Sequence, residues 1–439
     1  MKLTLWAYAA RFTGLASSML ILPFGLHYLP AEQFSIWMIF IAVYGLIIVF
    51  DFGLSLTFSR KVNYVYSSVE NSEASSQKVD ETSKEEYSRV YNASVTVFSI
   101  ISIIAVLVLT VFYFFYFPSI ENKLGYSICL EWFLFVLAIA VQLICLIYNV
   151  VYFGLNKNLI YYKCLSLSNF IFMLSAVSFF YFDFKLLSIS LGRFISSAVL
   201  IIMLVMLVEK TCHKKLYVKN KKFFEWGYIR SLLPASMSLG GVSLSNYLSN
   251  KSAVFFVSSY FPLDEAARFS LTHNIFSIIT SVSLIFMTAH NPKVNMYYKS
   301  GKFVELISMQ NKIRLVSLFF SIPAILVLVV FGDVILNVLG SETKLLPFSL
   351  VALFYLYSVL DINRNVSQYF IMSSDNVPFL KSSIISATFI VLLNFIFYDL
   401  GFKYIVLSIA IPLVVQLSFN FWFWTYQEVK LRRKVSCAE

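Results

Sequence analysis

Long apolar stretches alternate with short polar segments along almost the whole chain of 439 residues. About twelve of these stretches are long enough to cross a hydrocarbon core of about 30 Å, which needs roughly 20 apolar residues in a helix. The runs are continuous, whereas the strands of a membrane β-barrel would read as short segments of alternating polarity. The pattern therefore predicts an all-α, polytopic membrane bundle of about 12 transmembrane helices.

The expected spans divide into two groups of six. In chain order they are residues 5–28, 34–58, 93–117, 128–152, 159–182, 184–208, 230–259, 269–290, 313–338, 345–372, 378–398 and 402–426. We predict an N-terminal lobe at 1–208, a basic cytoplasmic linker at 209–229, a C-terminal lobe at 230–426 and a basic cytoplasmic tail at 427–439. Two such lobes around a central cavity are a common transporter architecture.

The positive charges alternate from gap to gap between the spans. Of the 34 Lys and Arg residues, 25 lie in or beside every second gap and the N-terminal end, five in the other gaps, and four inside spans. By the positive-inside rule, both termini are predicted to be cytoplasmic. The net charge of +11 does not indicate a nucleic-acid partner, because the basic residues flank helix ends instead of forming an aromatic-interleaved patch.

Composition and motifs favour a membrane protein without catalytic chemistry. Only 13% of the residues are charged, against about 25% in soluble domains. The sequence has no phosphate-binding GxxxxGK[ST] loop, no HExxH and no GxSxG. The five Cys residues are scattered without CxxC spacing. We therefore expect neither an enzyme nor a cofactor nor a metal site, and we expect the first apolar segment to be a retained helix.

One polar stripe follows a face of the span 345–372. Tyr357, Asp361, Arg364 or Asn365, and Gln368 recur at helical spacing, which places them on one side of the helix. Two interpretations remain open here. The stripe lines a cavity, or Asp361 and Arg364 form a self-neutralised structural pair.

Further polar and charged residues lie inside other spans. In the span 230–259, Asn246, Asn250 and Lys251 form a second stripe, and Lys251 either enters a cavity or reaches the outer headgroups. Arg193 lies too deep to reach the surface easily. An intramembrane charge is costly unless it faces a partner or water, so these residues are functional candidates.

The charges within the spans have an excess of cations. Arg11 and Asp51 lie at similar depth on neighbouring spans and are expected to pair. Four cations and two anions in the interior would favour an anionic solute such as a phosphate or diphosphate. His273 and His290 are candidates for proton coupling, although His290 precedes Asn291-Pro292, where helix capping is the simpler interpretation.

The second span and the segment after it carry a recognisable pattern. The run DFGLSLTFSRKVNYVYSS contains Asp51, Gly53 and Arg60. Four further residues belong to the same pattern: Arg11 in the first span, Pro30 and Glu32 in the turn after it, and Pro292 after the eighth span. With these residues and its twelve spans, the chain resembles the Wzx-type O-antigen flippases, which belong to the same superfamily as the multidrug and toxic-compound exporters.

The resemblance implies a two-lobed transporter that works by alternating access. Its substrate would be an undecaprenyl-diphosphate-linked oligosaccharide, moved from the cytoplasmic to the periplasmic leaflet, with membrane lipids and possible polysaccharide-assembly proteins as partners. The residues expected to bind substrate are Arg193, Asn246, Asn250, Lys251, Arg364 and Gln368, and those expected to form gates or ion pairs are Arg11, Asp51, Arg60 and Asp361.

Two other functions stay open at this point. A drug or metabolite cation antiporter of the same superfamily would need a defined carboxylate site, and Asp51 and Asp361 are the only deep acids. A membrane O-antigen polymerase or ligase would carry a large outer loop. The long gaps of this chain, 59–92, 209–229 and 291–312, fall instead on the side predicted to be cytoplasmic.

Overall fold

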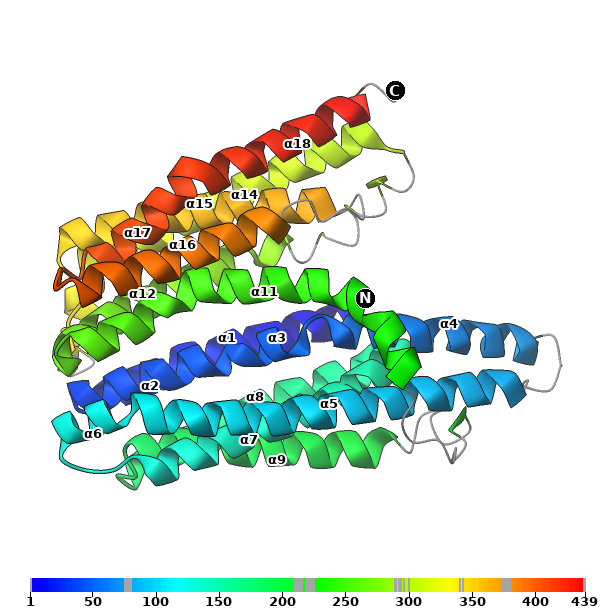
Figure 1. The fold of residues 1–439 in the computed structure, drawn as a ribbon, viewed down its shortest axis with the longest axis horizontal. Coiled ribbons are helices and arrows are strands. Elements are labelled where there is room, and N and C mark those ends of the chain that lie inside the picture. The colour runs from blue at the N-terminus through cyan, green and yellow to red at the C-terminus, as the bar shows by residue number, and fades with distance from the viewer. Residues whose placement is uncertain are drawn as a thin grey trace. The chain divides into compact units, whose positions relative to one another are not determined.

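The structure is a computed structural model that describes most of the chain. The described residues are 2–74, 81–208, 216–217, 226–287, 290, 294, 297–298, 301–338, 341, 343–372 and 380–436. All regular secondary structure in these ranges is helical (Figure 1). The prediction of an all-α, polytopic membrane bundle is confirmed.

The chain divides into two compact units, each described here by itself. Unit 1 comprises Met1–Leu29 and Val43–Ser243, and unit 2 comprises Pro30–Ala42 and Leu244–Glu439. The division falls inside one long helix, α11 (Trp226–Tyr260). The lobes expected at 1–208 and 230–426, and the cavity expected between them, stay predictions.

Unit 1 contains most of the N-terminal helices. They are α1 (Lys2–Tyr28), α3 (Leu46–Asp51), α4 (Leu54–Ala74), α5 (Glu81–Tyr116), α6 (Pro118–Leu124), α7 (Cys129–Gly154), α8 (Asn158–Tyr181), α9 (Leu186–Val208) and the first half of α11. Helix α7 packs against α5 and α9, and α8 packs against α1 and α9. Small residues permit close approach: a Cβ added at Gly192 of α9 would lie 3.1 Å from the Ala176 backbone nitrogen of α8.

Unit 2 contains the C-terminal helices and most of α2 (Ala31–Tyr44). The others are the second half of α11, α12 (Leu263–Ser283), α14 (Phe303–Val338), α15 (Phe348–Met372), α16 (Leu380–Asp399), α17 (Leu407–Val415), the π-helix η1 (Gln416–Asn420) and α18 (Phe421–Ser436). Helix α15 packs against α12, α14, α17 and α18. It therefore carries its polar stripe into the middle of this unit.

Nine helical stretches within the described residues are long and apolar enough to cross a membrane. Helices α1, α11 and α15 coincide with the three remaining expected spans, and each of them carries charged residues of the candidate site. Some helices also extend well past the expected spans. Helix α5 has 36 residues, about 54 Å at 1.5 Å per residue, which exceeds a hydrocarbon core of about 30 Å.

Candidate functional site

Arg193 of α9 is held by aromatic faces in unit 1. Its guanidinium carbon lies 3.6 Å from the ring centre of Phe172 on α8 and 4.3 Å from that of Tyr44. A guanidinium over a ring face is attracted by the negative face of the ring quadrupole. Tyr44 also accepts a long hydrogen bond of 3.5 Å from Nη1 of Arg193, and donates one of 2.6 Å to Oε1 of Gln142 on α7. No carboxylate among the described residues pairs with Arg193.

Asp51 ends α3 and caps the next helix. Its two carboxylate oxygens accept hydrogen bonds from the backbone N–H of Ser55 at 2.9 Å and from the hydroxyl of Ser55 at 2.7 Å. The chain turns between them through Phe52 and Gly53, which have φ values of 48° and 69°. Glycine adopts positive φ without strain, which explains the Asp-x-Gly pattern at this point. The carboxylate thus satisfies donors of the first turn of α4 (Leu54–Ala74).

Two other candidates of unit 1 have less defined surroundings. Arg60 is exposed on α4. Arg11 belongs to α1, but its side chain lies outside the described residues. The expected ion pair between Arg11 and Asp51 therefore stays a prediction.

In unit 2, three helices bring polar groups together around Asn250. The backbone carbonyl of Asn250 on α11 accepts a hydrogen bond of 2.7 Å from Nε2 of His273 on α12. Its side-chain oxygen accepts one of 2.6 Å from the hydroxyl of Tyr357 on α15. These residues line a small cavity, about the size of one water molecule. The sequence placed Asn250 and His273 among the candidates but did not connect them.

Lys251 and Asn246 lie beside this cluster on α11. Both side chains are partly buried. In the described part of the chain, the amino group of Lys251 has neither an ion-pair partner nor a hydrogen-bond acceptor. Lys251 is thus a second cation without a neutralising carboxylate among the described residues.

The polar stripe of α15 contains a complete ion pair. Nη2 of Arg364 lies 2.6 Å from Oδ1 of Asp361, and both residues are buried. Asn365 donates a hydrogen bond of 3.1 Å to the other carboxylate oxygen. The ion pair of the second interpretation is thus present, and the lining of a substrate cavity by this stripe stays a prediction. Gln368 is half-buried. Its side-chain nitrogen donates a long hydrogen bond of 4.0 Å to the sulfur of Met372.

His290 contacts a residue four positions earlier in the chain. Its Nδ1 lies 2.9 Å from the carbonyl oxygen of Phe286, four residues earlier. Its ring centre lies 4.1 Å from that of Phe286. Both the capping interpretation and proton coupling by His290 stay predictions.

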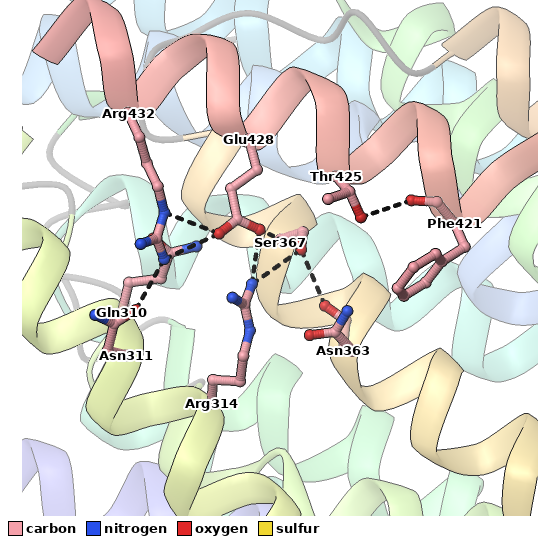
Figure 2. Close-up of polar contacts among 9 residues, drawn as sticks. All are labelled: Gln310, Asn311, Arg314, Asn363, Ser367, Phe421, Thr425, Glu428 and Arg432. Atoms are coloured by element: carbon pink, nitrogen blue, oxygen red, sulfur yellow. Dashed lines mark hydrogen bonds and ion pairs between the residues drawn. The ribbon is translucent and has the colours of Figure 1, made fainter.

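A buried carboxylate that the sequence did not single out joins α14, α15 and α18 (Figure 2). Oε2 of Glu428 lies 2.6 Å from Nη2 of Arg314 and accepts a hydrogen bond of 2.6 Å from the hydroxyl of Ser367. Oε1 lies 3.0 Å from Arg432, one turn later on α18. Arg432 also donates hydrogen bonds to Gln310 and Asn311 of α14.

The sequence signal for this cluster was weak. We assigned Glu428 and Arg432 to a cytoplasmic tail, and Arg314 to a set of topology-setting charges. The spacing of four residues between Glu428 and Arg432 could have indicated their ion pair, because residues four apart face the same side of a helix. The cluster joins three helices in unit 2 and contains no residue of the predicted substrate site.

No protein-family model and no curated protein sequence matches this chain. Solved structures do match it over nearly its whole length. The eukaryotic MATE transporter AtDTX14 is 13% identical with a TM-score of 0.63, covering 99% of this chain and 98% of that one. The MATE transporter VcmN of Vibrio cholerae, solved as a mutant, is 15% identical with a TM-score of 0.58, covering 99% of this chain and 97% of that one.

A third similar structure is the lipid II flippase MurJ in an inward closed conformation. It is 16% identical with a TM-score of 0.57, covering 99% of this chain and 90% of that one. At these identities the similarity concerns the fold alone. The chain therefore has the helical membrane fold that MATE transporters share with MurJ.

Proposed function

We propose that this protein is a flippase for an undecaprenyl-diphosphate-linked oligosaccharide. It moves this substrate from the cytoplasmic to the periplasmic leaflet of a bacterial inner membrane by alternating access. The observation that carries the proposal is the charge balance within the helices. Arg193 in unit 1 and Lys251 in unit 2 have no carboxylate partner among the described residues, whereas Asp361 is neutralised by Arg364.

This balance favours an anionic substrate over a cationic one. Placing a cation inside a membrane bundle costs free energy, so the charged side chain is expected to face a partner, water or substrate. Aromatic faces stabilise the charge of Arg193 without occupying all five of its N–H donors. A diphosphate can accept hydrogen bonds from such donors. The polar lumen would also remove the penalty of desolvating the sugar hydroxyls.

The fold is compatible with two classes of transporter. One similar structure is a lipid II flippase, and the others named above are MATE transporters. A MATE-like antiporter of cationic drugs is the alternative, and it would need an available carboxylate. Asp361 is paired with Arg364, and both oxygens of Asp51 accept hydrogen bonds from Ser55. We therefore rank the flippase first.

The test is deletion of the gene in its native host, followed by analysis of surface glycan and undecaprenyl-linked intermediates. Loss of long-chain glycan, with single lipid-linked repeats accumulating on the inner leaflet, would support the proposal. Repeats that reach the periplasm without being polymerised would indicate a polymerase. Unchanged glycan with altered sensitivity to cationic compounds would indicate the drug antiporter.

Complementation with variants connects that result to the charge balance. Arg193→Ala and Lys251→Ala should each fail to restore the glycan, and the exposed Arg433→Ala serves as a control for the loss of one positive charge. Full activity of both site variants would contradict the assignment of these residues.

A further inference from the structure

Unit 1 contains an apolar cavity of about 240 Å³ between the turn that follows α3 and helices α4, α5 and α11. Its lining consists of Phe52, Leu54, Val97, Ile100, Ile101, Trp226, Ile229, Ser236 and Met237. The one polar side chain in this set, Ser236, shares a hydrogen bond of 2.8 Å with Thr57 of α4. Apolar cavities without available polar partners stay dry, so the natural occupant is apolar.

The cavity lies toward the side of unit 1 that the charge bias predicts to be cytoplasmic. Its residues on α11 lie near the start of that helix. Those on α5 lie in the first third of the span expected at 93–117, which begins on the predicted cytoplasmic side. Trp226, the first residue of α11, is 55% exposed, and Trp is enriched where a helix meets the lipid headgroups. From Trp226 to Met237 the helix rises about 16 Å, at 1.5 Å per residue. The cavity therefore runs from the headgroup level into the hydrocarbon core.

The lining of the cavity reaches an exposed face of α5 at Ile100. Ile100, at its edge, is exposed and starts a row of exposed apolar residues along α5: Ile100, Ile103, Ile104, Leu107, Val108 and Val111. This spacing places the row on one face of the helix. A transmembrane helix with an exposed, wholly apolar face presents it to lipid tails. A chain in the surrounding leaflet thus has a direct path into the cavity.

A basic residue lies at the headgroup end. Arg230 of α11 is exposed, and it follows Trp226 by four residues and precedes Met237 by seven. These spacings place Arg230 on the same face of α11 as two lining residues. Basic residues close to the cytoplasmic leaflet attract its anionic headgroups.

We propose that this cavity is a binding site for an anionic phospholipid of the cytoplasmic leaflet. One hydrocarbon chain lies between α5 and α11, and the headgroup lies beside Arg230. The volume is several times the roughly 30 Å³ that one water molecule occupies in the liquid, which leaves room for a segment of chain. This site does not depend on the proposed transport activity, because it involves none of the cations assigned to substrate.

The test uses the full-length protein in phosphatidylcholine vesicles that contain phosphatidylglycerol brominated in one acyl chain. Bromine quenches tryptophan fluorescence on contact, and the signal of Trp226 is the difference between each protein and its Trp226→Phe counterpart. We expect half-quenching of Trp226 at an about fivefold lower mole fraction of brominated phosphatidylglycerol than of brominated phosphatidylcholine, as one basic residue near the surface would give.

Matched variants separate the site from ordinary lipid contact. Val97→Phe fills the cavity and should remove the preference, whereas Val108→Phe, the same change on the lipid-facing row of α5, should keep it. Ile101→Phe replaces Val97→Phe if the latter does not purify as a single species. Arg230→Gln should reduce the preference, and the exposed Arg433→Gln should not.

Three outcomes would overturn the proposal. Equal quenching by the two brominated lipids would exclude an anionic phospholipid as the preferred occupant. If the cavity-filled variants keep the same preference for brominated phosphatidylglycerol as Val108→Phe, the acyl chain does not enter the cavity. Equal effects of Arg230→Gln and Arg433→Gln would remove Arg230 from the site.

Discussion

Two arginines within apolar helices of this protein are stabilised in opposite ways. In unit 2, Arg364 pairs at 2.6 Å with Asp361, which lies three residues earlier on the same helix. In unit 1, Arg193 lies over the rings of Phe172 and Tyr44 and has no carboxylate partner among the described residues. The first arrangement cancels its own charge, and the second retains it. The position of an arginine inside an apolar helix therefore does not by itself distinguish a structural residue from a substrate-binding one.

The largest expected effect follows from breaking the pair in unit 2. Asp361→Asn leaves Arg364 as an uncompensated buried charge, so we expect a loss of about 3–5 kcal/mol in the free energy of unfolding. Denaturation in detergent with a circular-dichroism readout would measure it. The double variant Asp361→Asn/Arg364→Gln should recover most of the loss, and no recovery would mean that the pair is not an independent unit.

A smaller effect is expected at the carboxylate that joins α14, α15 and α18. Glu428→Gln removes the charge that Arg314 and Arg432 share, while these arginines stay about a quarter exposed. Hydrogen bonds to charged groups contribute about 1.5–3 kcal/mol each, and partial solvation of the arginines places the expected loss toward the lower end. The same unfolding measurement applies, with the exposed Glu305→Gln on α14 as the control.

Substitution of Arg193 should reduce transport activity more than it reduces stability. Arg193→Met keeps an unbranched but shorter side chain and removes its charge, and the lost ring contacts are worth about 0.5–2 kcal/mol. We expect little destabilisation together with loss of glycan export in the complementation assay. A stable variant with full export would mean that the charge of Arg193 has a structural role only.

The smallest expected effect concerns the cluster around Asn250. Tyr357→Phe removes one hydrogen bond of 2.6 Å to the Asn250 side chain, and a hydrogen bond of this kind contributes about 0.5–1.5 kcal/mol. The unfolding free energy should fall by this amount, with Tyr355→Phe on the same helix as the control. A larger loss would indicate that His273 also changes position.

The sequence was sufficient for the fold because its signal is the length and continuity of apolar runs. The polar stripe of α15 was also predictable, since Asp361 and Arg364 lie on one helix and helical spacing alone brings them together. Contacts between helices were not predictable in this way. The rings that hold Arg193 come from residues 21 and 149 positions away. Glu428 meets Arg314 across 114 residues.

Sequence position did not indicate the contacts at the end of the last span. We placed Glu428 in a basic cytoplasmic tail at 427–439, without expecting it to be buried. The structure buries it, because α18 continues along α14 and α15, whose Arg314 and Ser367 compensate the carboxylate. Helical spacing indicates which side chains share a face, but it does not indicate which neighbouring helix covers that face.

The π-helix η1 has a consequence for the tolerance of this region to insertions and deletions. A π turn accommodates one residue more than an α turn, so the helices before and after it keep their faces in place. A regular α-helix of the same sequence would rotate Glu428 by about 100° relative to α17. Deleting one residue within 416–420 should therefore restore regular geometry and keep Glu428 opposite Arg314. The same deletion between Phe421 and Gln427 would turn the carboxylate away, so length variation among natural homologues should concentrate in η1.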